Sequence, residues 1–323
     1  MSTRVSSPPF GDRLAAAADR RGTPLVLGLD PDPARLWPGI TPSGDDPAAT
    51  SLGLQAALAH EGTRPGALAA LAVYEHCRQV IEATAHSCVA VKLQVASFER
   101  LGPAGWQTLH AVAQLVRDAD LLLIADAKRG DIDVTAESYA AALFDGTETP
   151  WGWVPGLGAD AVTVNPLMGH DAIQPFLDRA RAVGGGIFVL VRTSNPGAAD
   201  FQEQRLASGE PLWQRIAGQV AALDSGKGAL ADAGAVCGAT VPERVAELRQ
   251  LMPRAPFLLP GVGAQGGTID GLRAAFAPGL GGGLVTVSRG LVRAHETSGD
   301  HDAAAAAASA ARDLRDQCLR AAA

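Results

Sequence analysis

The chain has 323 residues, 47% of them hydrophobic and 19% charged, an ordinary composition for a globular protein with a sizeable core. The net charge of −7 gives no support to nucleic-acid binding, which usually requires a basic patch. The four cysteines are scattered without CxxC or Cys/His spacing, so the sequence predicts neither a zinc site nor a disulfide framework.

The pattern of apolar residues predicts helices and strands that alternate along the chain. Several strands are continuous apolar runs, which is typical of parallel strands buried on both faces. In chain order the expected elements are helix 10–21, strand 24–30, helix 66–84, strand 88–94, helix 103–118, strand 121–127, helix 132–144, strand 160–165, helix 169–183, strand 186–192, helix 210–222, strand 233–239, helix 241–252, strand 257–261, a helix from about 268, strand 283–288 and helix 302–321.

Eight strands, each followed by a helix, indicate one (β/α)8 barrel that spans residues 1–323 as a single domain. Residues 34–65 interrupt this rhythm after the first strand. They are rich in Pro, Gly, Thr and Asp, so we expect a surface insertion with a short helix near 52–60. A doubly wound open sheet with extra strands is the alternative architecture.

The most informative stretch begins with the apolar run Leu121–Ala125 and continues into closely spaced charges. Because side chains on a strand alternate between faces, Asp126 and Lys128 are expected to point the same way. Asp131 follows the turn at Gly130, and the residues alone suggest a helix cap there. A solvated charged loop is the plain alternative, but the C-terminal end of a buried parallel strand is where such folds bind ligands.

Polar residues also follow the other expected strands. In a barrel the C-terminal ends of the strands converge around one cavity, so these residues form a candidate site. For any one of them taken singly, a structural ion pair is the competing interpretation. The candidates from strand ends are Asp30, Lys92, Asp126, Lys128, Asn165 and Ser194.

The last two strands point to a phosphate site. A glycine-rich loop at 260–267 contains Gln265, and Arg289 follows the last strand. Exposed backbone amides next to an arginine bind anions well, and barrels often hold a phosphate after strands 7 and 8. The glycines mimic the GxGxxG fingerprint, but the downstream ribose-binding acid is missing, which argues against a dinucleotide site. No HExxH or other metal-ligand spacing occurs, so no metal or cofactor is expected.

The sequence also bears on location. The N-terminal residues lack the apolar core of a signal peptide, and no stretch is long enough to span a bilayer. We therefore expect a cytoplasmic protein with no membrane partner.

Six blocks of sequence together resemble the orotidine 5′-phosphate decarboxylase family, most closely its bacterial type 2 branch. That branch has longer chains with an insertion after the first strand. The resemblance covers nearly the whole chain in order, and it implies a barrel enzyme that needs no cofactor. The blocks are LGLDP at 27–31, VKLQ at 91–94, DAKRGDI at 126–132, RTSNPGA at 192–198, PGVGAQGG at 260–267 and SRG at 288–290.

The resemblance implies a charged catalytic network of Lys92, Asp126, Lys128 and Asp131. Lys128 would donate a proton to C6 of the pyrimidine after carbon dioxide leaves, and Asp126 would lie against the substrate carboxylate. Asp131 would enter the site from the other subunit of a homodimer, in place of the capping role that the residues alone suggest. Two neighbours would enter with it, Ile132 and Thr135.

The remaining implied roles concern the nucleotide. Asp30 and Lys92 would hold the ribose hydroxyls, and Ser194 would face the pyrimidine. Gln265 and Arg289 would grip the 5′-phosphate.

Two residues depart from the family pattern, namely Asp133, where a small residue is common, and Leu167, where an aromatic residue is common. Both lie beside the matched blocks, so they put details of the rim in question more than the activity.

The expected reaction is the decarboxylation of orotidine 5′-monophosphate to UMP in pyrimidine biosynthesis. Two other functions stay open. One is a metal-dependent sugar-phosphate aldolase or decarboxylase on the same barrel, since the spacing D-x-K-x-x-D alone is shared with such enzymes. The other is a non-catalytic barrel that binds a nucleotide, although such a module has no need for costly alternating charges.

Overall fold

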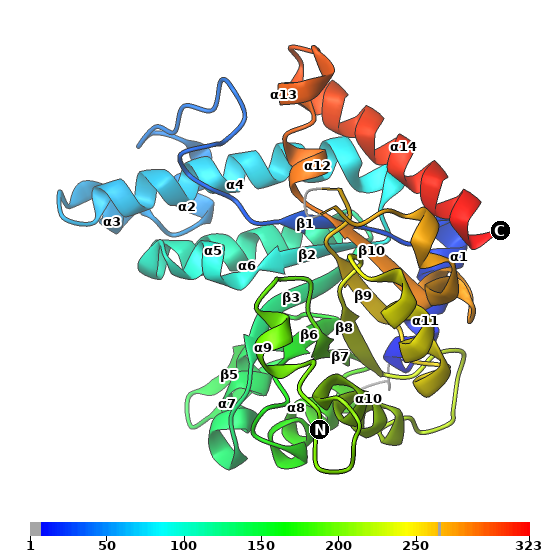
Figure 1. Cartoon of the computed structure of the whole chain (residues 1–323). Helices are drawn as coiled ribbons and strands as arrows, with labels where there is room; N and C mark the ends of the chain where they lie inside the picture. The colour runs from blue at the N-terminus through cyan, green and yellow to red at the C-terminus, as the bar shows by residue number, and fades with distance from the viewer. Residues whose placement is uncertain (1–7, 264–265) are drawn as a thin grey trace.

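Eight parallel strands close into a barrel in the computed structural model, which describes residues 8–263 and 266–323 (Figure 1). The ring closes because β10 pairs with β1. The predicted (β/α)8 barrel is confirmed, and a doubly wound sheet is excluded because an open sheet has unpaired edges. In order around the ring the strands are β1 Leu25–Leu29, β2 Ala90–Gln94, β3 Leu122–Arg129, β6 Ala161–Val164, β7 Gly186–Arg192, β8 Ala233–Cys237, β9 Phe257–Pro260 and β10 Gly283–Val287.

Helices follow the strands and cover the outside of the barrel (Figure 1). Their places agree with those expected from the sequence, except that the segment after β9 is a 3-10 helix rather than an α-helix. This segment is short and Pro278 follows it, which favours a tighter and shorter helix. The covering helices are α4 Arg64–Thr84, α6 Gly102–Asp118, α7 Asp133–Leu143, α8 Gln174–Ala182, α10 Leu212–Ala222, α11 Pro242–Leu251, η3 Asp270–Phe276 and α14 Ala303–Ala322.

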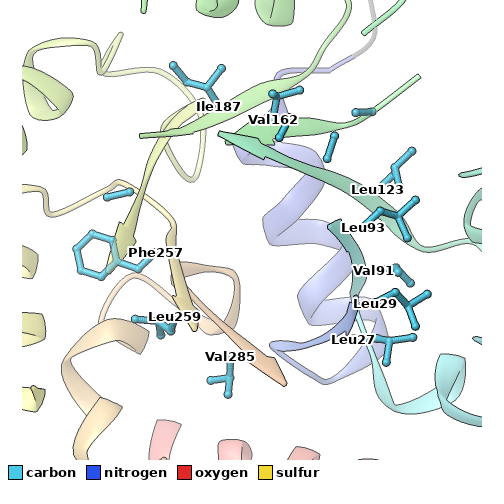
Figure 2. Packing of buried hydrophobic residues seen from close by; sticks show 14 of the residues in the cluster. Leu27, Leu29, Val91, Leu93, Leu123, Val162, Ile187, Phe257, Leu259 and Val285 are labelled. Carbon is cyan, nitrogen blue, oxygen red and sulfur yellow. The ribbon is translucent and has the colours of Figure 1, made fainter. Parts of the chain in front are cut away.

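The strands are buried on both faces, as their apolar runs predict. Side chains such as Leu27 and Leu123 point outward and pack against the helices in the larger hydrophobic cluster (Figure 2). Alternate residues such as Val26 and Leu122 point inward and form a second cluster, the inner core. The barrel is therefore a packed solid at this level, not a pore.

Helix α1, Phe10–Arg21, seals the N-terminal end of the barrel. Phe10 and Leu14 belong to the inner core, and the Phe10 ring meets the Phe188 ring edge to face at 6.0 Å. Helix α1 also approaches the backbone of Leu230 so closely that residue 11 must be glycine. A Cβ on Gly11 would lie 2.0 Å from the carbonyl oxygen of Leu230. With this end closed, a ligand must approach from the C-terminal ends of the strands.

The expected insertion between β1 and α4 contains the short helix predicted near 52–60, which is α3 Gln55–Ala59, and a second short helix that was not predicted, α2 Pro47–Ser51. Leu54 and Leu58 pack with residues of α4 and α6 in a third hydrophobic cluster. The insertion therefore lies against the outer helices of its own chain.

Trp37 anchors the start of the insertion. Its backbone N–H donates to Nδ1 of His76 on α4 at 3.2 Å, and its indole Nε1 donates to the carbonyl of Val292 at 2.6 Å. Val292 ends the short helix α12, Arg289–Val292. The anchor thus joins the insertion to α4 and to the turn that begins with Arg289.

Several small elements of the structure were not predicted from the sequence. An antiparallel hairpin of β4, Gly146–Thr149, and β5, Gly152–Pro155, follows α7 and exposes Trp151. The other small elements are the short helices η1 Ala85–Ser87, α5 Val95–Glu99, η2 His170–Ala172, α9 Ala198–Phe201, η4 Leu280–Gly282 and α13 His295–Ser298.

Within the part of the chain that the structure describes, no helix combines the length and apolar character needed to cross a bilayer.

Candidate functional site

The inner face of the barrel changes from apolar to polar toward the C-terminal ends of the strands. On β3 the inward residues Leu122 and Ile124 belong to the inner core, and Asp126 comes next. On β2 the inward residue Ala90 is followed by Lys92. This alternation places charged groups directly above an apolar floor, where their interactions are less screened by water than at a surface.

A cavity of about 420 Å³ lies above this floor. It brings together six of the residues predicted from strand ends and motifs, although they are far apart in the sequence. These residues are Asp30, Lys92, Asp126, Lys128, Ser194 and Arg289.

The centre of the site is the carboxylate of Asp126. Nζ of Lys92 donates to Oδ2 at 2.6 Å, and Nζ of Lys128 donates to Oδ1 at 2.5 Å. The hydroxyl of Thr163 donates to the same Oδ1 at 2.9 Å. One carboxylate thus holds two ammonium groups, and the cluster of three charges carries a net charge of about +1.

Asp126 stays ionised in this arrangement. Burial by itself raises the pKa of this carboxyl, but the charges of Lys92 and Lys128 outweigh burial and lower the pKa to about 2. The side chains differ in exposure, at 12% for Lys92 and 44% for Lys128. Lys128 is therefore the ammonium group that a ligand in the cavity can reach.

The backbone of Lys128 lies in the left-handed region, with φ at 49°. The pairing of β3 with β6 is irregular here, since its register shifts between Ala125 and Arg129. The amide of Lys128 donates to the Thr163 hydroxyl at 2.9 Å, which holds the strained residue in place. Strain of this kind costs on the order of 1–3 kcal/mol and is concentrated at functional sites.

Arg289, which follows β10, adds another cation to the cavity wall. The guanidinium of Arg289 is exposed and makes no hydrogen bond or ion pair with another residue in the described ranges 8–263 and 266–323. Pro260 and Gly261 of the glycine-rich loop line the same cavity. Gln265, the predicted partner of Arg289, lies outside the described residues. An arginine without a protein partner beside a cavity is suited to an anionic ligand.

Four predicted residues do not line this cavity. The side-chain oxygen of Asn165 accepts from the Leu167 amide at 3.1 Å, so Asn165 orders the turn after β6. Asp131, Ile132 and Thr135 lie at the start of α7, where Ile132 is 45% exposed. None of these three residues lines the cavity of its own chain.

The structure adds residues that the sequence reading did not single out. One of them is Thr163, whose hydroxyl donates a hydrogen bond to Asp126. Thr286 lines the cavity from β10, and its hydroxyl is buried without a hydrogen-bond partner among the described residues. Both threonines are inward-facing and stand near the C-terminal ends of their strands. That position is the only signal in the sequence, and it becomes usable once the strand bounds are known.

Comparison with known proteins identifies the family of this chain. A family model described as "Orotidine 5'-phosphate decarboxylase / HUMPS family" matches residues 23–306. The chain belongs to this family. Curated proteins named orotidine 5′-phosphate decarboxylase include one from Rhodopirellula baltica, 36% identical over 293 residues and 89% of each chain. Another, from Haloarcula marismortui, is 39% identical over 289 residues, or 89% of this chain and 88% of the relative.

A solved structure shares the fold of this chain over nearly its whole length. The OMP decarboxylase of Leishmania donovani matches with a TM-score of 0.68 and 29% sequence identity, covering 97% of this chain and 98% of that chain. The family resemblance read from the six sequence blocks is therefore confirmed.

The two departures from the family pattern have distinct structural settings. Asp133 has a φ of 47°, a left-handed backbone that glycine adopts most easily and that aspartate tolerates. Leu167 is 69% exposed on the turn after β6. Neither residue lines the cavity, so the charged centre is intact.

Proposed function

We propose that this protein decarboxylates orotidine 5′-phosphate to uridine 5′-monophosphate (UMP) and carbon dioxide, a step of pyrimidine biosynthesis. The observation that carries the proposal is Asp126 bound by Lys92 and Lys128 in a cavity that Arg289 also lines. The names of the relatives from Rhodopirellula baltica and Haloarcula marismortui support the same reaction. The four buried, unpaired cysteines fit a cytoplasmic location, which is part of the proposal.

The cavity residues suggest one orientation of the substrate. Arg289 binds the 5′-phosphate, and the same role is proposed for Gln265, which lies outside the described residues. Asp30, which accepts a hydrogen bond from the Ser288 hydroxyl, holds the ribose together with Lys92. Ser194 faces the pyrimidine from the loop after β7. This orientation directs the carboxylate of the substrate toward Asp126 and Lys128.

In the proposed reaction the bond between C6 and the carboxylate breaks, carbon dioxide leaves, and the electron pair stays on C6. No adjacent carbonyl can delocalise that pair, so fixed charges must stabilise it. The ammonium of Lys128 does so across a short distance in a site with little water. It then transfers a proton from Nζ to C6, which gives UMP, and the neutral lysine takes a proton from water.

Asp126 contributes in two ways. It orients Lys128 through the 2.5 Å hydrogen bond, and it keeps a negative charge because its pKa is about 2. A substrate carboxylate placed against this charge is repelled, and the repulsion ends when carbon dioxide leaves. Enzymes lower barriers by about 8–23 kcal/mol, and this reaction requires the upper end of that range.

The active unit in this proposal is a homodimer with shared sites. Asp131, Ile132 and Thr135 do not line the cavity of their own chain, so they are free to reach the cavity of a partner. The surface around them exposes large apolar side chains, including Val134 at 73% and Leu167 at 69%. Exposed apolar groups that gather in this way mark interaction surfaces.

Two other functions compete with this one. The family description also covers the HUMPS branch, so a metal-dependent sugar-phosphate lyase is the first alternative. A barrel that binds a nucleotide without turnover is the second. The relatives that match at 36% and 39% identity carry the decarboxylase name, which favours the proposed reaction.

The deciding experiment follows the loss of ultraviolet absorbance when the protein meets orotidine 5′-monophosphate in the presence of EDTA. The chain has three lysines, Lys92, Lys128 and Lys227, and the exposed Lys227 provides a matched control. We expect metal-independent turnover by the wild type and by Lys227→Ala, and none by Lys128→Ala, which should still bind UMP.

Three other outcomes would overturn parts of the proposal. Turnover by Lys128→Ala would remove this residue from the role of proton donor. No turnover of orotidine 5′-monophosphate, together with magnesium-dependent turnover of a sugar phosphate that EDTA abolishes, would support the lyase. UMP binding by the wild type without release of carbon dioxide would support the binding barrel.

A further inference from the structure

Three consecutive residues of the loop after β7 line the cavity, namely Thr193, Ser194 and Asn195. The loop continues to residue 211, where α10 is about to begin, and it is exposed over much of its length. Fixing a loop of this length in one conformation costs conformational entropy, which contacts to its residues must offset. The position of Ser194 therefore depends on the contacts that hold this segment.

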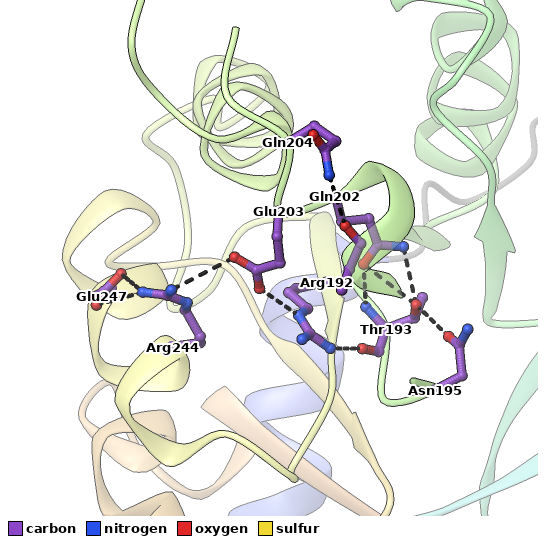
Figure 3. A network of polar contacts seen from close by, with 9 residues as sticks. Arg192, Thr193, Asn195, Gln202, Glu203, Gln204, Arg244 and Glu247 are labelled. Carbon is purple, nitrogen blue, oxygen red and sulfur yellow. Dashed lines mark hydrogen bonds and ion pairs between the residues drawn. The ribbon is translucent and has the colours of Figure 1, made fainter. Parts of the chain in front are cut away.

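The side chain of Gln202 binds this segment through both ends of its amide (Figure 3). Its Oε1 accepts from the backbone amide of Thr193 at 2.8 Å. Its Nε2 donates to the hydroxyl of the same threonine at 3.0 Å. The Thr193 hydroxyl in turn donates to Oδ1 of Asn195 at 2.7 Å. Gln202 thus fixes the residues on both sides of Ser194.

The end of β8 fixes the same segment from the other side. A Cβ on Gly238 would lie 2.8 Å from Cα of Ser194, and the Gly238 amide donates to the carbonyl of Arg192 at 2.7 Å. The segment is therefore packed between the β8 terminus and the Gln202 amide. If the amide contact is lost, the segment can move only away from Gly238, which carries Ser194 along.

Gln202 is itself held in place. Its backbone carbonyl accepts from the Trp213 amide at 3.0 Å, which ties it to α10. The next residue, Glu203, accepts from Arg192 Nε at 3.0 Å and lies 3.6 Å from the guanidinium of Arg244 (Figure 3). These contacts connect the Gln202 backbone to β7 and α11, so the amide is presented from a fixed base.

We propose that Gln202 is a positioning residue that sets how the site recognises the pyrimidine, acting through Thr193 on Ser194. The inference rests on the proposed function, in which Ser194 faces the base. Gln202 does not line the cavity. Its loss should therefore weaken recognition of the base and leave recognition of the ribose phosphate intact.

The test compares Gln202→Met, which keeps the length of the side chain but removes both hydrogen bonds, with Gln202→Glu, which keeps an acceptor for the Thr193 amide and removes only the donor to the Thr193 hydroxyl. Gln204→Met is the matched control, because Gln204 lies on the same loop and its side chain hydrogen-bonds only to the Ala199 carbonyl among the described residues. Two ligands separate the parts of the nucleotide. UMP contains the base, whereas ribose 5-phosphate lacks it. Affinities are measured by calorimetry, and kcat and KM by the absorbance assay.

We expect Gln202→Met to lose about tenfold or more in UMP affinity and in kcat/KM, while its affinity for ribose 5-phosphate matches the wild type. Gln204→Met should stay within about threefold of the wild type for both ligands, and Gln202→Glu, which keeps one of the two hydrogen bonds, should lose less UMP affinity than Gln202→Met. Gln202→Met that binds UMP like the wild type would overturn the proposal. So would an equal loss for both ligands, which indicates a general structural defect, or an equal loss in Gln202→Glu.

Failure of the proposed function gives a different result. If the wild type shows no turnover and binds UMP no better than ribose 5-phosphate, the assignment of Ser194 to the base fails before any variant is made. If the wild type prefers UMP and Gln202→Met keeps that preference, only the role of Gln202 is wrong.

Discussion

Two of the three lysines in this chain donate to one carboxylate. Burying Asp126 to 8% exposure of its side chain costs free energy, which the two ammonium groups and the Thr163 hydroxyl offset. Removing either lysine leaves the carboxylate with fewer partners in a poorly hydrated place. The cluster is thus better explained by chemistry at the cavity than by a gain in stability.

Thr286 offers a test of the cavity at the scale of one residue. Its hydroxyl is buried on the cavity wall without a partner among the described residues, so a bound ligand can satisfy it. We expect Thr286→Val, which has nearly the same shape, to weaken UMP binding by about 5- to 20-fold. Thermal unfolding should be unchanged or shifted slightly upward, because an unsatisfied polar group is removed.

Thr163→Val is the matched comparison, because Thr163 is equally buried but fully engaged with Asp126 and Lys128. That variant should lose about 1–3 kcal/mol of unfolding free energy. UMP affinity unchanged in Thr286→Val would show that this hydroxyl does not face the ligand.

The charged residues of the site could be predicted from the sequence, but the threonines could not. Asp126 and Lys128 interrupt an apolar run, which marks them as costly and therefore informative. Thr163 and Thr286 are ordinary strand residues, and only closure of the barrel shows that they face the cavity. Alternation predicted that Asp126 and Lys128 would meet, but it did not predict the left-handed backbone of Lys128.

At the scale of elements, the anchor of the insertion contains a titratable group. His76 is 1% exposed on α4, and its Nδ1 accepts from the Trp37 amide. Burial lowers the pKa of His76 to about 4, and the nearby His295 adds to this effect. His76 is therefore neutral at physiological pH, and protonating it would remove the acceptor that holds Trp37.

This pKa gives a prediction for stability against pH. Between pH 6.5 and about 4 the unfolded chain binds a proton at His76 that the folded chain does not, so stability falls as the pH falls. We expect His76 to contribute about 2–3 kcal/mol to the loss of unfolding free energy between pH 7.5 and 4.5. Urea unfolding of the wild type and His76→Gln measures this contribution.

Glutamine cannot titrate, and its side-chain oxygen can still accept from the Trp37 amide, so His76→Gln should lose correspondingly less stability over the same interval. Other groups that titrate in this range contribute equally to both proteins. The same loss in both would mean that His76 is not the group responsible.

The long elements were predictable, whereas the short ones were not. The strands of the barrel are buried apolar runs, and helices such as α4 and α6 have a clear apolar face, so pattern alone located them. The hairpin β4–β5 is mostly exposed and has no alternation of apolar and polar residues. Its strands are held by backbone pairing, which leaves little signature in the sequence.

At the scale of the whole molecule, the cavity of one chain brings together most of the predicted site residues that the structure describes, but not all of them. Asp131, predicted from the DAKRGDI block to belong to the charged network, does not line the cavity. Strand order could predict which residues of a chain converge, because the barrel fixes that geometry. It could not predict a contribution from a second copy, because nothing in the strand pattern describes a surface between subunits.

A mixing experiment tests whether the sites are shared. Lys128→Ala and Asp131→Ala chains should each be inactive alone. In a mixed dimer one site carries both substitutions and the other carries neither. The unsubstituted site has Lys128 from one chain and Asp131 from its partner. After equal mixing and free exchange of subunits, about one quarter of wild-type turnover should return. If both residues act within one chain, every site stays defective and no turnover returns, whatever the oligomeric state.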